Sequence, residues 1–290
     1  MTLTVDSIPK ELIASYLGGT CGFFVGAGLS CSAGFPNWNK LLIGLIEKAA
    51  KDHLLTEEKA IECRGLAGDP NKYLLLAEEL KEVLGGMGFK TFIEDTFLDK
   101  SIKPTPTHDL LVKLKNNMFI ITTNFDRLIE MAFVKNNELQ LPFKYYEASS
   151  FQRMLYRREF FLLKAHGDAQ TAADKIVFTD KDYRRLLYRE PGYQSALQSM
   201  FTMYSVIFIG CSLQDPELKL LLNYINAAFP EGGTQHYALM TTESTTPTEC
   251  SRWRKDYNMR IISISSDNNY EDINTFLRVL QDKEVEAAQE

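Results

Sequence analysis

Apolar residues in this chain gather into short runs, separated by longer stretches of helical spacing. The runs at residues 21–25, 118–122, 160–164 and 205–210 have no polar face, and residues 236–240 and 260–264 are expected to add two further strands. A strand that is apolar on both sides is buried on both faces, as parallel strands in α/β proteins are. Alternation of such strands with helices predicts an α/β fold, with a doubly wound, Rossmann-like parallel sheet.

The first two strands are separated by a long region, residues 38–100, that the pattern predicts to be wholly helical. Apolar residues recur at helical spacing over 38–51, which indicates an amphipathic helix. Asp69 is placed to cap another helix, and Gly85 to stop it. This region is therefore expected to form a helical lobe inserted into a single domain, residues 1–283.

The C-terminal third continues the alternation. Helices are predicted to begin near Asp215 and Pro247, and a closing helix is predicted over 270–282. The Glu-rich segment 284–290 lacks the apolar residues that would hold it against a core, so we expect it to be a disordered acidic tail.

Charge and hydropathy narrow the function classes. The net charge is −6 and the isoelectric point is about 5.4, which gives no broad basic field for nucleic acid. No apolar stretch reaches the roughly 20 residues that span a bilayer, and the first residues do not resemble a secretion signal. We therefore expect a cytoplasmic protein that binds neither membrane nor a specific nucleic-acid sequence.

The five cysteines are scattered along the chain and contain no Cys-x-x-Cys pair: Cys21, Cys31, Cys63, Cys211 and Cys250. An odd, unpaired set argues against a disulfide framework, and the spacing argues against a structural zinc site. We expect reduced thiols and no zinc.

A glycine-rich turn, Gly26-Ala-Gly-Leu-Ser30, follows the first predicted strand. A helix that begins after such a turn offers backbone N–H groups to a pyrophosphate, and glycine lets the backbone come close to the phosphate oxygens. The same turn can serve only to let a helix leave a strand tightly, and in isolation the two readings are about equal.

Polar residues also follow three other predicted strands. Asn124 and Asp126 come after the second strand, His166 after the third, and Gly210 closes the fourth. Because ligands of open α/β sheets bind beyond the carboxyl ends of strands, these residues are expected to meet in one crevice. On residue type alone, Asp126 could be only a helix cap and His166 only a buried core residue.

Taken in order, four motifs resemble the NAD-handling core of the sirtuin (Sir2) superfamily: Gly26-Ala-Gly-Leu-Ser30, Thr122-Thr-Asn-Phe-Asp126, His166-Gly167 and Gly210-Cys-Ser-Leu-Gln-Asp215. The resemblance implies a set of roles. Catalytic roles fall to Asn124, which would orient water and ribose, and His166, the general base. NAD-binding roles fall to Gly26, Ala27, Gly28 and Ser30 at the phosphates, Phe35, Pro36 and Asp126 at nicotinamide, and Gly210 and Ser212 at the adenosine half. By contrast, Tyr183 is expected to be a packing residue.

Departures from the sirtuin pattern refine this expectation. The four zinc-binding cysteines of sirtuin deacetylases are missing, and Asn37 and Asn39 stand where that family has Asp and Arg. The pattern looks closer to zinc-less Sir2-like NAD hydrolases of bacterial anti-phage defence. It implies cleavage of NAD to ADP-ribose and nicotinamide. A zinc-free ADP-ribosyl or acyl-lysine transferase and a non-catalytic NAD or ADP-ribose sensor remain as alternatives.

The same resemblance suggests how activity is controlled. An unregulated NAD hydrolase would harm its own cell, and the predicted domain fills the sequence. We therefore expect regulation by assembly, either as a homo-oligomer or with a defence-associated, HerA-like ATPase.

Overall fold

The computed structural model describes residues 3–213, 215–229 and 233–289, and within them seven parallel strands form one sheet. The strand order is β3-β4-β2-β1-β5-β6-β7. The strands are β1 (Cys21–Val25), β2 (Asn117–Thr122), β3 (Phe143–Lys144), β4 (Phe161–Lys164), β5 (Ser205–Ile209), β6 (His236–Thr241) and β7 (Met259–Ile264). The chain builds the sheet first on one side of β1 and then on the other. The direction of winding therefore reverses between β1 and β5, which is where open α/β sheets bind ligands.

The central strands are buried on both faces, as their apolar runs predict. Every residue of β1, β2, β4 and β5 is buried, and Phe24 of β1 lies in register with Phe208 of β5 and Ile121 of β2. Alternate side chains enter different cores, so that Phe23 and Phe24 belong to two separate apolar clusters. The predicted doubly wound parallel sheet is confirmed.

Two layers of helices cover the sheet. One layer packs around Phe23 and consists of α1 (Lys10–Leu17), α6 (Pro106–Lys113), α7 (Leu128–Lys135) and α13 (Asp267–Ala287). The other packs around Phe24 and consists of α8 (Ala148–Arg157), α9 (Asp180–Arg189), α10 (Pro191–Met203), α11 (Pro216–Ala228) and α12 (Pro247–Tyr257). Shorter turns of helix are α2 (Ala27–Cys31), η1 (Val5–Ser7), η2 (Pro70–Lys72), η3 (Tyr145–Glu147) and η4 (Ala173–Lys175).

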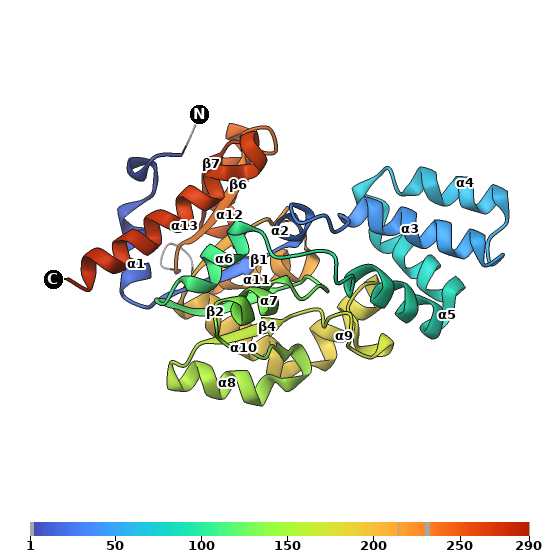
Figure 1. Ribbon diagram of the computed structural model, residues 1–290, viewed down its shortest axis with the longest axis horizontal. Coiled ribbons are helices and arrows are strands. Elements are labelled where there is room, and N and C mark those ends of the chain that lie inside the picture. The colour runs from blue at the N-terminus through green and yellow to red at the C-terminus, as the bar shows by residue number, and fades with distance from the viewer. Residues whose placement is uncertain (1–2, 214, 230–232, 290) are drawn as a thin grey trace.

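The inserted lobe is helical, as predicted, and projects to one side of the sheet (Figure 1). It contains α3 (Trp38–Lys51), α4 (Glu57–Leu66) and α5 (Tyr73–Phe97), which share a third apolar core. The predicted stop at Gly85 is a kink, where φ is 65° and ψ is 169°, and a second helical segment continues beyond it. Trp38 stacks on Phe178 at 5.0 Å between ring centroids, which ties the lobe to the loop before α9.

The C-terminal segment differs from the expectation of disorder. Helix α13 continues to Ala287, and Glu284 accepts hydrogen bonds from the backbone N–H groups of Lys115 and Asn116, each at 2.7 Å. These two backbone N–H groups, which lie just before β2, therefore anchor the end of α13. Composition alone does not reveal this contact. Among the described residues, no helix is both long enough and apolar enough to cross a membrane.

Candidate active site

A pocket opens beyond the carboxyl ends of β1, β2 and β4, where the lobe meets the sheet. Its lining is Ala27, Ser30, Pro36, Asn37, Trp38, Leu41, Phe97, Thr123, Asn124, Phe125, Asp126, His166, Tyr183 and Asp215. Apolar side chains of α3 and α5 supply one wall, and polar residues at the strand ends supply the other. A concave site of this kind, with a few convergent polar groups, is typical of a small-molecule site.

Three glycines let the turn after β1 pack directly on the turn after β5. A Cβ at Gly26 would lie 2.5 Å from the carbonyl oxygen of Gly210, and one at Gly28 would lie 2.8 Å from the same atom. Gly210 itself has φ of 65°. The N–H of Gly26 donates to Ile209 and that of Gly28 to Gly210, at 3.0 and 2.9 Å. These two amides therefore hold the turns together, and the glycines shape the floor of the site by lacking side chains.

Asn124 lies two residues beyond β2 and is held rigidly. Its Nδ2 donates to the carbonyl oxygen of Gly26 at 3.0 Å and to Oγ of Ser30 at 2.8 Å. A carbonyl oxygen can only accept, so this contact fixes which end of the amide is the nitrogen. The remaining atom, Oδ1, is buried and has no hydrogen-bond partner. The side chain thus presents a fixed, unused acceptor beside the turn.

Asp126 joins this group from the same loop. Its Oδ2 accepts a hydrogen bond from Ser30 Oγ at 2.6 Å, while its Oδ1 accepts one from the N–H of Leu128 at 2.9 Å. The second contact reaches the first residue of α7, whose N-cap is Arg127, so Asp126 is not itself the cap that residue type suggests. The first contact ties the loop to α2. Below the loop, the buried Lys164 ammonium donates to the backbone oxygen of Asp126 and pairs with Glu130 at 3.2 Å.

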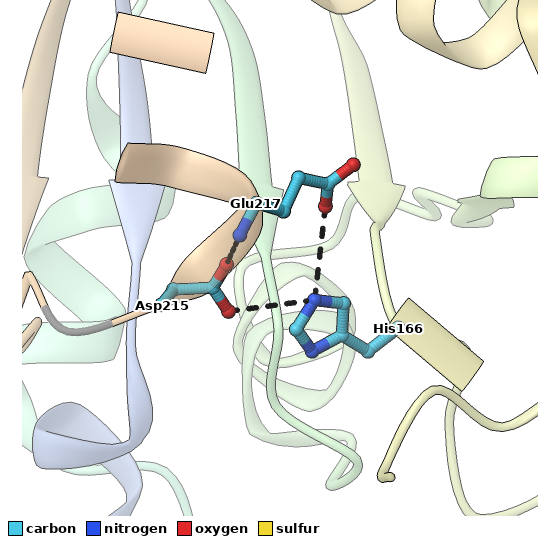
Figure 2. A group of neighbouring side chains, drawn as sticks. All are labelled: His166, Asp215 and Glu217. Carbon is cyan, nitrogen blue, oxygen red and sulfur yellow. Dashed lines mark hydrogen bonds and ion pairs between the residues drawn. The ribbon is translucent and has the colours of Figure 1, made fainter. Parts of the chain in front are cut away.

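His166 lies two residues beyond β4 and faces two carboxylates (Figure 2). Its Nε2 is 3.6 Å from Oδ2 of Asp215 and 3.9 Å from Oε2 of Glu217, and it has no hydrogen-bond partner. The ring stands edge-on to Tyr183, with centroids 5.2 Å apart. Because both carboxylates come from the start of α11, the sheet brings together residues about 50 positions apart in sequence.

Burial shifts the titration of the groups around His166. Desolvation raises the pKa of Glu217, and the facing imidazole opposes that shift. Desolvation, followed by the charge of Asp215, raises the pKa of Tyr183 well above its usual range. Tyr183 therefore keeps its proton, and its hydroxyl donates to Oδ2 of Asp215 at 2.8 Å.

Most of the residues assigned from the sequence meet in this pocket. Ala27, Ser30, Pro36, Asn124, Asp126 and His166 line it, and Gly26, Gly28 and Gly210 lie directly beneath. Phe35 points elsewhere, because its ring packs against Phe97 in the core of the lobe at 5.5 Å between centroids. Ser212 is exposed and is not among the lining residues of the described structure. Gln214, which belongs to the fourth motif, lies outside the described residues.

Sequence reasoning missed three ionisable residues of the site. Tyr183 was expected only to pack, Asp215 only to cap α11, and Glu217 had no assigned role. Asp215 does cap α11, since its Oδ1 accepts from the N–H groups of Glu217 and Leu218 at 3.0 and 3.1 Å, but its other oxygen faces the pocket. The one signal in the sequence for this cluster was a second carboxylate, Glu217, two residues after the capping Asp215.

The cysteines take no part in the pocket lining. All five are free thiols, and Cys21 and Cys63 are buried in apolar cores. In the described part of the chain, the group of His, Cys, Asp and Glu side chains close enough to share a metal ion is His166, Asp215 and Glu217. That group contains no cysteine.

Known proteins match this chain along most of its length. Defense-associated sirtuin 2 of Bacillus subtilis is 26% identical over 286 residues, which cover 93% of this chain and 26% of that protein. NAD(+) hydrolase ThsA of Bacillus cereus (strain MSX-D12) is 26% identical over 297 residues, with 97% and 58% covered. The chain therefore spans between about a quarter and three fifths of the length of these relatives.

Comparison of structures adds a distant likeness. The solved structure of Sir2Tm bound to a propionylated peptide has a TM-score of 0.44 and 14% identity, with 95% of this chain and 98% of that chain covered.

One family comparison covers half of the sequence. The SIR2-like domain matches residues 118–262, a span that contains Asn124, Asp126, His166 and Gly210. The chain therefore belongs to the SIR2-like domain family.

Proposed function

We propose that this protein is an NAD hydrolase that cleaves NAD to ADP-ribose and nicotinamide. The observation that carries the proposal is the pairing, in one pocket, of a rigid amide that has an unpartnered acceptor and a buried imidazole. Asn124 Oδ1 is buried without a hydrogen-bond partner, and the His166 ring lines the same pocket. A buried polar atom without a partner costs about 1–3 kcal/mol, so a ligand that supplies contacts in this pocket offsets part of that cost.

The reaction proceeds through an oxocarbenium-like ribose. The bond between the ribose C1′ and the nicotinamide nitrogen breaks, and nicotinamide leaves with the bonding electrons as a neutral molecule. Asn124 Oδ1 holds the water or ribose hydroxyl, water adds to C1′, and His166 accepts the proton that water loses. The carboxylates of Asp126 and Asp215 at the pocket wall oppose the positive charge that develops on the ribose.

Binding of NAD divides between the two walls of the pocket. The turn of Gly26 to Ser30 lies at the start of α2 and suits the pyrophosphate, with Ala27 and Ser30 at the surface of the pocket. Pro36, Trp38 and Phe97 form an apolar wall that suits the flat nicotinamide ring. These assignments keep the pocket roles of Ala27, Ser30 and Pro36 and replace Phe35 by the Phe97 side chain against which it packs.

We further propose that the reaction serves bacterial anti-phage defence through NAD depletion. The names of two relatives, a defence-associated sirtuin and an NAD(+) hydrolase, support this role. Regulation would come from assembly, as a homo-oligomer or with a HerA-like ATPase.

The test is NAD turnover by the purified protein and by Asn124→Ala and His166→Ala, with nicotinamide and ADP-ribose measured by chromatography. We expect each variant to lose at least about a hundredfold in rate, the usual effect of removing a positioned acid–base group. Near-normal turnover in both soluble variants would contradict the assignment.

Two matched controls come from the other end of the sheet. Asn117 is also buried with an unpartnered Oδ1, but it begins β2 instead of following it. His236 is also buried and begins β6, where its Nδ1 accepts from the N–H of Val206 at 3.2 Å. We expect Asn117→Ala and His236→Asn to keep near-normal turnover while folded, because neither side chain reaches the pocket.

A further inference from the structure

Three ionisable side chains meet at the edge of the pocket, which His166 and Asp215 line, and the proposed reaction gives the third, Glu217, no role. His166 Nε2 lies between Asp215 Oδ2 and Glu217 Oε2, and Figure 2 shows the other ring nitrogen, Nδ1, on the side turned away from the carboxylates. The side chains of His166 and Glu217 are only 4% and 6% exposed. Water therefore does little to screen the interaction between them.

We infer that Asp215 and Glu217 are positioning residues that hold a proton on His166 Nε2 and stabilise the imidazolium, which leaves Nδ1 as the atom that accepts the proton. The inference rests on the proposed NAD hydrolysis, because it assigns the protonation states of that reaction's base. Neither carboxylate needs to touch the substrate for this role.

The surroundings fix both carboxylates in place. Asp215 Oδ1 caps α11, and its Oδ2 accepts from Tyr183. Glu217 accepts from Gln194 Nε2 at 2.7 Å and from the Tyr193 hydroxyl at 3.2 Å. Burial raises the pKa of both tyrosines, so they remain donors. One oxygen of each carboxylate is thereby left facing the same imidazole nitrogen.

Charge balance favours a proton at this nitrogen. Burial penalises an isolated carboxylate strongly, and a facing cation offsets that penalty. The distances of 3.6 and 3.9 Å are longer than a hydrogen bond but lie within ion-pair range, and such contacts tighten when a substrate binds. The N–H of neutral His166 therefore belongs at Nε2, and its lone pair at Nδ1.

The proton then follows a balanced path. Water loses one proton to Nδ1 as its oxygen bonds to C1′, and His166 becomes an imidazolium that carries N–H on both nitrogens. Asp215 and Glu217 balance the new positive charge. After the products leave, the proton on Nδ1 passes to solvent and the neutral ring is restored.

A divalent cation is the rival occupant, because the three ligand atoms lie within 4.8 Å of one another. A cation would use Nε2 as a ligand and displace its proton. The charged and titratable groups that face His166 are Asp215 and Glu217 from α11 and Tyr183 from α9, with Tyr193 of α10 behind Glu217. The positioning role therefore predicts a proton on His166 Nε2, whereas a bound cation predicts that Nε2 carries none.

The experiment is an NMR measurement of the imidazole nitrogens of His166 in the wild type, Asp215→Asn and Glu217→Gln, with His166→Ala to assign the signals. Asn caps a helix as well as Asp does, so the first variant should fold, and Gln keeps an acceptor for Tyr193. We expect the neutral ring of the wild type to carry its proton on Nε2, and each variant to lose part of that preference, since each removes a facing charge. The kcat for NAD should fall at least about tenfold, with KM changed less than about threefold.

Asp272→Asn is the matched control. Asp272 is a buried carboxylate that accepts from the backbone N–H groups of Leu3 and Ser265, at the start of α13. We expect its replacement to leave the proton of neutral His166 on Nε2.

A proton position on His166 that is the same in both site variants as in the wild type would overturn the inference. So would tight binding of Mn²⁺ or Zn²⁺ to the wild type that Asp215→Asn abolishes. The NMR measurement needs no turnover, so it tests the inference even if the protein fails to cleave NAD, an outcome that would instead remove the proposed function.

Discussion

Replacement of Gly210 by alanine tests whether the contact between the two glycine turns builds the floor of the site. The added Cβ would lie 2.6 Å from the backbone nitrogen of Leu29 and 3.2 Å from the carbonyl carbon of Gly28. Both obstacles are backbone atoms of the β1 turn, which cannot swing aside as a flexible side chain does. Gly210 also has φ of 65°, a conformation that strains any residue with a Cβ.

The expected loss has two parts. The left-handed backbone costs about 1–2 kcal/mol for a non-glycine residue. Overpacking against fixed atoms adds about 1–3 kcal/mol. Gly210→Ala should therefore lower the free energy of unfolding by roughly 2–5 kcal/mol, or about 4–20 °C in Tm for a chain of this size.

Gly19→Ala separates the two contributions. Gly19 has φ of 64°, and a Cβ there would meet nothing within 4 Å. It should lose only the backbone part, about 1–2 kcal/mol. Urea unfolding followed by circular dichroism measures both variants. Equal losses in the two would refute the claim that the turns are in forced contact.

Three further predictions concern titration, metal and assembly. Burial lowers the pKa of His236 to about 4, so between pH 6.5 and 4 the unfolded chain binds the additional proton; the unfolding free energy should fall by up to about 3 kcal/mol as pH drops through this window. Urea unfolding at several pH values should show that the unfolding free energy of His236→Asn falls less with decreasing pH than that of the wild type. An equal fall in the two proteins would contradict this prediction. Because the five thiols are free, elemental analysis should find no stoichiometric zinc and chelator should leave fold and turnover intact; one zinc per chain would count against this. Light scattering at micromolar concentration should show a homo-oligomer, and a strict monomer with full activity would argue against regulation by self-assembly.

The sequence predicts the central strands well because they have no polar face, whereas β7 exposes Arg260 and Ser263. Residues 21–25 form β1 with the predicted bounds, since a five-residue apolar run after two glycines is too short for a buried helix. The edge strand β3 was not predicted, because two residues carry no periodicity. The sequence also does not mark the bounds of helix α4, because the helix has only two buried residues, Ala60 and Cys63, and so lacks an apolar stripe.

Only those residues of the site that follow strand ends could be predicted from the sequence. Asn124 and His166 each lie two residues beyond a buried strand, so the topology itself directs them to one crevice. The contact of His166 with Glu217 depends on how α11 begins after β5, and no local pattern encodes it. Phe35 was assigned to the pocket by resemblance, yet the lobe offers it an aromatic core in which Phe97 is its neighbour.

Hydrolysis of NAD in this pocket through Asn124 and His166 has a definite product ratio. The decisive measurement is the stoichiometry of products when purified protein, at concentrations up to tens of micromolar, meets NAD. We expect one free ADP-ribose for each nicotinamide released, in the wild type and not in Asn124→Ala or His166→Ala. Intact NAD throughout, or nicotinamide released without free ADP-ribose, would contradict it.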